Sequence, residues 1–482
     1  PALHVLGGVG GAPGLQVLDT TDPAQIARTA SRIDLSRTLC IVSSKSGTTL
    51  EPALLAAHFQ DRMRQAVGPA RAGSPFAAVT DPGSALEEMA AAEGFRRGWS
   101  GRPDVGGGVS VLSSFGLVPA AACGLDVSAF LAPARKMAER CGPDVPAGSN
   151  PGVRPGLLLG LAAAAGRDKV TLVLTPSIRV LGGWLEQLLA ESTGKAGRGL
   201  IPIVDEDLGP PSAYGTDRLF VQLRVEGDAQ PEQDAALRIL AGAGHPVVTL
   251  PVPGREALAG EFFRWELATA VCGAVLGVNP FDQPDVEQAK VAARTLTAAW
   301  EAGGGFPEDP PAVRADGAAL FADPATLSRL RASGRGPDTL EGLLSAHVAS
   351  AGPGDYVALL AYLDRSEDNT GLLQRIRGRI RDSRGVATSV GFGPRYLHST
   401  GQVFKGGPAT GVFVLLTTDD AAADLPVPGR SCTFGAVEMA QALVVLEVLA
   451  ARGRRVIRLH LESGAGAGLE RVASLFERAL AG

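Results

Sequence analysis

The sequence predicts an α/β fold in which parallel sheets are flanked by helices. Short apolar runs rich in β-branched residues alternate with longer helical stretches along the chain, which is the pattern of repeated βα units. With 482 residues the chain is also too long for one ordinary core. We therefore predict domains at 1–150, 151–302 and 303–482, with the first boundary in the Pro- and Gly-rich stretch 141–155.

In the first domain we expect strands at 39–42 and 77–80, a helix over about 50–65, a loop at 98–108 and a helix near 115–123. The second domain should contain three strands and two helices, with the strands at 170–174, 219–225 and 247–252 and the helices at 180–190 and 261–276. The stretch 303–338 reads as an irregular link. After it we expect strands at 356–363, 386–390, 411–417 and 456–461.

Charge and cysteine content exclude several classes of protein. The net charge is −5 with no basic stripe, which argues against nucleic acid as a partner. The five cysteines form no CxxC pair, so we expect neither a disulfide framework nor a cysteine-rich zinc site. No apolar stretch of about 20 residues and no signal peptide is visible, which predicts a cytoplasmic protein without a membrane span. The chain opens at Pro1, which indicates a processed or truncated start.

The most distinctive loop follows the first predicted strand. Ser44, Lys45, Ser46, Thr48 and Thr49 lie between that strand and a helix start. Hydroxyls, free backbone N–H groups and the positive end of the helix dipole together suit a phosphate group. An N-capped surface turn is the alternative. We prefer the anion site, because the loop has more hydroxyls than a cap needs.

A second candidate lies near the end of the helix predicted at 180–190. Gln187 and Glu191 are four residues apart, so both project from one helix face. A carboxylate beside an amide, where a helix meets a glycine loop, suits proton transfer. A solvated helix end explains these two residues equally well.

Two further strings contain candidate groups. Asn279–Lys290 is a proline-rich turn that starts a helix, and its Gln283 and Lys290 are two helical turns apart. Gly391–Gln402 places His398 in a polar loop, and histidine is the usual acid or base near neutral pH. A solvated lysine and a hydrogen-bonded structural histidine are the respective alternatives.

Together the strings 44–51, 191–195, 279–290 and 391–407 resemble the glucose-6-phosphate isomerase family. They are most similar to the isomerase half of bacterial transaldolase/glucose-6-phosphate isomerase fusions. The resemblance covers nearly the whole chain. It implies two SIS-type domains, each a flavodoxin-like α/β/α sandwich, followed by a C-terminal α/β extension.

The resemblance also implies an activity and a set of roles. The family interconverts glucose 6-phosphate and fructose 6-phosphate without a metal or cofactor, and is commonly dimeric. By position in the motifs, Ser44, Lys45, Ser46, Thr48 and Thr49 would bind the phosphate of the hexose 6-phosphate, and Gln187 and Gln283 would also bind substrate. Glu191 would move the proton through a cis-enediol, while His398 and Lys290 would open the ring.

Three positions depart from the family pattern. Gly108 stands where the family has an arginine that stabilises the enediolate, and such a loss usually costs about 10²–10³ in rate. The glycine-rich stretch 5–11 lacks the serine of an earlier phosphate loop, and Phe404 stands where relatives often have histidine. Gly108 and the stretch 5–11 keep open the alternative of an impaired sugar-phosphate-binding protein or a fragment. An amino-sugar phosphate isomerase is a further alternative, and the string Asn279–Lys290 favours the glucose-6-phosphate isomerases over it.

Overall fold

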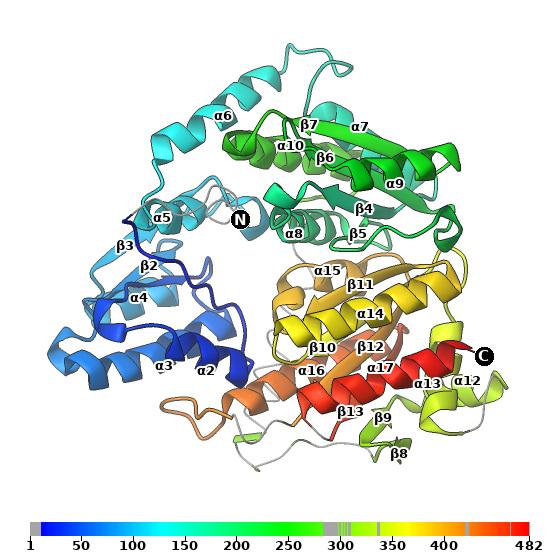
Figure 1. Cartoon of the computed structure of the whole chain (residues 1–482). Helices are drawn as coiled ribbons and strands as arrows, with labels where there is room; N and C mark the ends of the chain where they lie inside the picture. Colours follow the sequence, from blue (N-terminus) through cyan, green and yellow to red (C-terminus); the bar gives the residue numbers. More distant parts are fainter. Residues whose placement is uncertain are drawn as a thin grey trace.

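A computed structural model describes most of the chain, in the residues 11–282, 297, 300, 301, 303, 306, 310–334, 338–419, 424–462 and 464–481. These residues form three β-sheets of three, four and six strands, each with helices packed around it (Figure 1). We call the sheets with their helices the N-terminal, central and C-terminal units. The predicted α/β class with parallel sheets is confirmed.

The N-terminal unit is built on a parallel sheet of order β1-β2-β3. Its middle strand β2 is buried along its whole length, because helices cover both faces. Helix α3 presents Leu54, Phe59 and Met63 to this core. The elements are α2 (Pro23–Ser31), β1 (Cys40–Ser43), α3 (Leu50–Val67), β2 (Phe76–Thr80), α4 (Ala85–Ala92), β3 (Arg97–Ser100) and α5 (Ser114–Ala122).

The central unit has a parallel sheet of order β5-β4-β6-β7. Strand β4 is buried along its whole length, as a strand covered on both faces should be, although it includes Lys169 and Thr171. Helix α6 packs on α10, and its Phe130 belongs to the same core as β4. The elements are α6 (Val127–Arg140), α7 (Val153–Ala164), β4 (Lys169–Leu174), α8 (Leu181–Thr193), β5 (Ile201–Ile203), β6 (Arg218–Val225), α9 (Pro231–Gly242), β7 (Val247–Val252) and α10 (Leu258–Leu276).

The C-terminal unit has a mixed sheet of order β11-β10-β12-β13-β9-β8, in which β8 and β9 run antiparallel to their neighbours. Helix α16 packs on β10, β12 and β13, so it is a core helix here, although its length and apolarity alone would suit a membrane span. The elements are β8 (Val313–Ala315), β9 (Ala318–Phe321), α12 (Pro324–Ala332), α13 (Leu340–Ala349), β10 (Tyr356–Tyr362), α14 (Glu367–Arg384), β11 (Ala387–Phe392), α15 (Gly401–Gly406), β12 (Gly411–Thr418), α16 (Phe434–Ala451), β13 (Arg455–Leu461) and α17 (Ala465–Ala481).

The structure corrects two of the predicted loops. The stretch 98–108 begins with strand β3, which is mostly exposed and therefore has no buried apolar run to announce it. The stretch 303–338 contains β8, β9 and α12. Asp316 and Gly317, both with positive φ, join β8 to β9 in a two-residue turn. Such an Asp-Gly pair is a recognised hairpin signal, so this strand pair could have been predicted.

The central and C-terminal units share one continuous interior. Residues of β5, β10 and β11 belong to a common apolar cluster that includes Ile203, Leu360 and Ala387. The predicted boundaries at 150 and 302 stay predictions. The shared cluster matters for function, because it holds the residues that follow β11 against the central unit.

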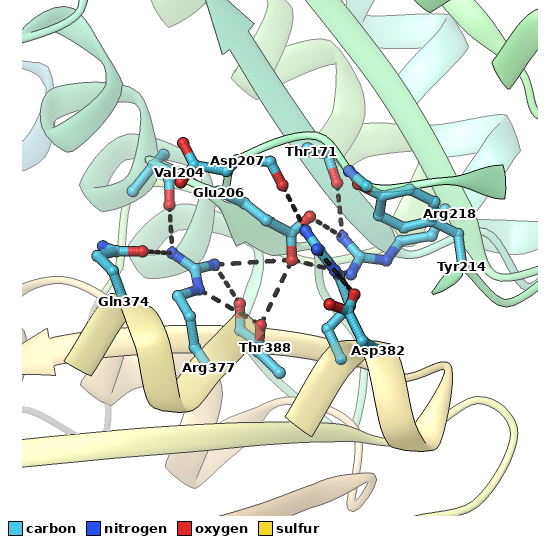
Figure 2. A network of polar contacts seen from close by, with 12 residues as sticks. Thr171, Val204, Glu206, Asp207, Tyr214, Arg218, Gln374, Arg377, Asp382 and Thr388 are labelled. Atoms are coloured by element: carbon cyan, nitrogen blue, oxygen red, sulfur yellow. Dashed lines mark hydrogen bonds and ion pairs between the residues drawn. The ribbon is translucent and has the colours of Figure 1, made fainter. Parts of the chain in front are cut away.

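A buried group of ionic side chains crosses the same contact. Figure 2 shows Glu206, in the loop after β5 of the central unit, facing Arg218 of β6 and Arg377 of α14. Both nitrogens at the end of the Arg218 guanidinium donate to the Glu206 carboxylate at 3.2 Å. Burial acts to raise the pKa of Glu206, but the two arginines outweigh it and hold that pKa below its usual value. The carboxylate therefore stays charged and links the two units.

Candidate active site

The predicted phosphate loop lies at the carboxyl end of β1, where ligands of parallel sheets usually bind. The buried Oγ of Ser44 has no hydrogen-bond partner among the described residues. Oγ of Ser46 and Oγ1 of Thr48 lie 3.0 Å apart. An unpartnered buried hydroxyl is costly unless a ligand satisfies it. The loop thus has the features expected of an anion site.

The helix start beside this loop has donors to offer. Thr49 precedes α3 in extended conformation, and its side chain makes no capping bond to the helix. The first N–H groups of α3 therefore receive no side-chain cap from it. Gly47 has a φ of +68° and a Cβ there would lie 2.7 Å from the backbone nitrogen of Leu86, so glycine alone lets the loop close down on α4.

Lys45 extends along the edge of the same loop. Its ammonium group pairs with the Asp81 carboxylate and donates to the backbone oxygen of Arg102 at 2.9 Å. These contacts link the loop after β1 to the loops after β2 and β3. The charge of Lys45 is thereby held beside the hydroxyl groups.

Glu191 lies buried near the end of α8, one turn after Gln187. The Gln187 side-chain nitrogen donates to Oε2 of Glu191 at 3.2 Å, as the spacing of four predicted. A Cβ built on Gly108 would lie 3.5 Å from that same oxygen. Position 108 of the N-terminal unit therefore faces the carboxylate of the central unit directly, and the absent side chain would have met Glu191.

His398 reaches the N-terminal unit from the C-terminal one. It ends the short 3₁₀ helix Arg395–His398 after β11, and its Nε2 lies 3.3 Å from Oε1 of Glu51 in the first turn of α3. Burial acts to raise the pKa of Glu51, but the charge of His398 and hydrogen bonds from His398 and Gln441 lower it overall. Glu51 is thus a charged partner that can orient the imidazole.

The string that follows α10 is only partly described. Lys195, just after Glu191, is buried and donates to Asp282 Oδ1 at 2.8 Å, which ties the Asn279–Asp282 turn to the end of α8. Gln283 and Lys290 lie outside the described residues, as does most of the stretch 5–11. Phe404 packs among the buried rings of Tyr356 and Phe413. It therefore fills the core.

The structure groups the described candidates into two contacts. One joins Gly108, Gln187 and Glu191, and the other joins His398 to the helix that starts at the phosphate loop. Sequence reasoning missed Glu51 as a partner of His398, although an acid in the first helical turn was visible. It also missed Gln441, because a glutamine within an apolar helix does not by itself indicate a site. Among the described residues, no group of three or more His, Cys, Asp or Glu is arranged to hold a metal ion.

Comparison with known proteins identifies related sequences and folds. The family described as phosphoglucose isomerase matches residues 7–199. The glucose-6-phosphate isomerase of Rubrobacter xylanophilus is 31% identical over 320 residues, which cover 58% of this chain and 73% of the relative. That of Heliobacterium modesticaldum is 33% identical over 289 residues, with 52% and 64% covered. The match to this second relative thus spans slightly less than two thirds of its length.

A solved structure has a fold similar to that of this chain. A hypothetical protein of Thermus thermophilus superposes with a TM-score of 0.55 at 26% identity, and the match covers 61% of this chain and 79% of that one.

The family match ends at residue 199, so it includes Ser44, Gly108 and Glu191 but neither His398 nor Gln441.

Proposed function

The chain belongs to the phosphoglucose isomerase family, and on that premise we propose that it interconverts glucose 6-phosphate and fructose 6-phosphate. The observation that carries the proposal is the pair of contacts around the site. A buried carboxylate at the end of α8 faces the loop after β3, while a histidine from a third unit meets the helix that begins at the phosphate loop. Sugar isomerisation needs both an acid for ring opening and a base for proton transfer.

In this mechanism the phosphate binds at the start of α3. The unpartnered hydroxyl of Ser44 donates to it, and Ser46, Thr48 and Thr49 supply further hydroxyls. Lys45 adds charge, and the helix dipole favours the anion. Binding of the phosphate group fixes the position of the first two carbons of the hexose.

Ring opening is assigned to His398. The protonated imidazole gives a proton to the ring oxygen as the carbon–oxygen bond of the ring breaks, and the anomeric hydroxyl loses its proton to solvent and becomes the carbonyl. Lys290, which lies outside the described residues, is assigned an assisting role. Glu51 holds the imidazole by its Nε2 contact and stabilises the charged form. The open-chain sugar then presents the hydrogen on C2 to the base.

Proton transfer is assigned to Glu191. Its carboxylate removes the proton from C2, giving a cis-enediolate. It returns the proton to C1 as the proton of the C2 hydroxyl moves to O1. Gln187 donates to the carboxylate, and Gln283 is assigned to substrate binding. Gly108 adds no charge at the point where the enediolate forms, so we expect a slower enzyme than one with an arginine there.

A coupled assay of fructose 6-phosphate conversion by the purified chain tests the proposal. We expect turnover that is lost in Glu191→Gln, which keeps the size of the side chain and removes the base. Turnover no higher than that of the Glu191→Gln variant would contradict the assignment. A preference for glucosamine 6-phosphate over glucose 6-phosphate would move the chain to the amino-sugar isomerases.

The finer features of the resemblance are part of the same proposal. We take the chain to correspond to the isomerase half of a transaldolase/isomerase fusion, acting in the cytoplasm on a free hexose 6-phosphate. We expect a homodimer, which sedimentation of the purified chain would test. These assignments rest on the motif resemblance alone.

A further inference from the structure

The carboxylate of Glu51, which contacts His398, also accepts a hydrogen bond from helix α16. The Gln441 side-chain nitrogen donates to Oε1 of Glu51 at 2.8 Å. The hydroxyl of Thr21 donates to Oε1 of Gln441, also at 2.8 Å. Thr21, Gln441 and Glu51 are all buried, with at most 6% of their surface exposed. They form a continuous row that ends on the imidazole of His398.

The chemistry of the row fixes the orientation of the amide. A glutamine side chain can donate from its nitrogen and accept at its oxygen. Because the Thr21 hydroxyl donates to the oxygen, the nitrogen is left to face Glu51. The rotated amide would place its oxygen against a charged carboxylate, which is repulsive. Thr21 therefore selects the orientation in which Gln441 supports Glu51.

Gln441 is also tied to the histidine loop through its main chain. The hydroxyl of Tyr362 donates to the backbone oxygen of Gln441 at 3.4 Å, and that of Tyr396 donates to the Tyr362 hydroxyl at 3.1 Å. Tyr396 lies two residues before His398. The loop is thus joined to one residue of α16 by two routes, one through Glu51 and one through the tyrosine pair.

Several ionisable groups lie near this row. Burial, aided by neighbouring Tyr396 and Glu438, raises the pKa of Tyr362 well above its usual value, and burial also raises that of Tyr396. Glu438, one turn before Gln441, has its pKa raised by burial and by Asp22, Asp424 and Asp364. Within the row itself Glu51 and His398 are the ionisable residues, because the side chains of Thr21 and Gln441 carry no titratable group.

We propose that Gln441 and Thr21 are positioning residues for the ring-opening histidine and act on it through Glu51. This inference rests on the proposed function. It extends the site to α16 and to the chain segment before α2, well beyond the residues that touch the sugar. A role in packing alone would affect stability without favouring one chemical step.

The test separates ring opening from proton transfer. A fructose 6-phosphate analogue without the 5-hydroxyl cannot close its ring, so it needs no ring-opening acid. We expect Gln441→Leu, which loses a hydrogen bond to a charged group, to lower kcat on fructose 6-phosphate about 10-fold. Thr21→Val loses a hydrogen bond to a neutral amide and should lower kcat about 5-fold. On the analogue the kcat of both variants should be unchanged. Thr21→Ser, which keeps the hydroxyl, should restore the wild-type ratio of kcat on fructose 6-phosphate to kcat on the analogue.

Thr20→Val is the matched control, since the buried Thr20 hydroxyl accepts a bond from the backbone of Asp22 and lies outside the row. NMR titration of the His398 imidazole gives a second readout that needs no turnover. Its midpoint should move in Gln441→Leu and Thr21→Val and stay in Thr20→Val.

Equal loss on both substrates, or unchanged rates, with a wild-type titration would overturn the inference. If the wild-type chain is inactive but the midpoint still moves only in these two variants, positioning holds and the proposed function fails.

Discussion

The two junctions that bring the site together differ in composition. The central and C-terminal units share an apolar cluster and bury Glu206 among arginines. The N-terminal unit meets them through apolar residues at the start of α16 and through single polar contacts, such as His398 to Glu51. We infer that the first junction fixes Glu191 relative to His398. The second connects the helix that begins at the predicted phosphate loop to both residues.

The largest expected effect comes from breaking the junction between the central and C-terminal units at Glu206. Glu206 is 2% exposed, and Glu206→Ala would leave Arg218 and Arg377 buried without their carboxylate. We expect the free energy of unfolding to fall by about 3–5 kcal/mol. Urea denaturation measures this. Asp382→Ala is the control, because Asp382 pairs with Arg381 but is half exposed, and should cost about 0–1 kcal/mol. Equal losses in both variants would mean that the buried group is not the link.

The next prediction concerns the space beside Glu191 where Gly108 of the N-terminal unit has no side chain. A Cβ at position 108 makes only ordinary van der Waals contacts, so Gly108→Arg should fit and place a cation beside the enediolate. We expect kcat to rise about 10²–10³-fold in the coupled assay. Gly107→Arg adds the same charge where a Cβ meets nothing within 4 Å, and should leave kcat unchanged. A gain in both variants, or in neither, would contradict the geometry.

A smaller effect separates substrate binding from stability within the N-terminal unit. The Ser44 hydroxyl has no partner in the described chain, so Ser44→Ala should raise KM about 10-fold or more and leave the free energy of unfolding unchanged or higher. Ser84→Ala is the opposite case, because the Ser84 hydroxyl bonds Thr80 and caps α4. It should cost about 1 kcal/mol and leave KM alone. Kinetics and denaturation on both variants check this contrast.

A further effect is in the pH dependence of stability, where two buried glutamates of the central unit should act oppositely. The lowered pKa of Glu206 contributes stability above its unfolded pKa, and that stability is lost as pH falls through the folded value. Burial raises the pKa of Glu186 to about 7, so its contribution is full below about pH 4.5 and is lost as pH rises to about 7.

Denaturation at pH 4.5 and pH 8 compares the corresponding variants. Glu186→Gln should gain stability over the wild type as pH rises. Glu206→Gln should be less stable than the wild type at neutral pH, and this deficit should shrink towards low pH. Parallel curves for the two variants would contradict the assigned shifts.

The sequence predicted the buried parallel strands well, because runs such as 170–174 and 411–417 consist mostly of apolar residues. It missed β5, whose three residues at a sheet edge include Pro202 and leave no pattern. The helix spacing of Gln187 and Glu191 was readable, since that relation is local. The contacts of Gly108 with Glu191 and of Glu51 with His398 join distant segments, and only the packing of three units reveals them.

The role of Glu191 is tested most sharply by following the hydrogen on C2. Fructose 6-phosphate is incubated with the purified chain in ²H₂O, and NMR detects deuterium at C2 of the glucose 6-phosphate formed. We predict deuterium with the wild-type chain and none with Glu191→Gln, because that carboxylate exchanges its proton with solvent while it holds the enediol. Equal deuterium in both proteins would show that Glu191 is not the base.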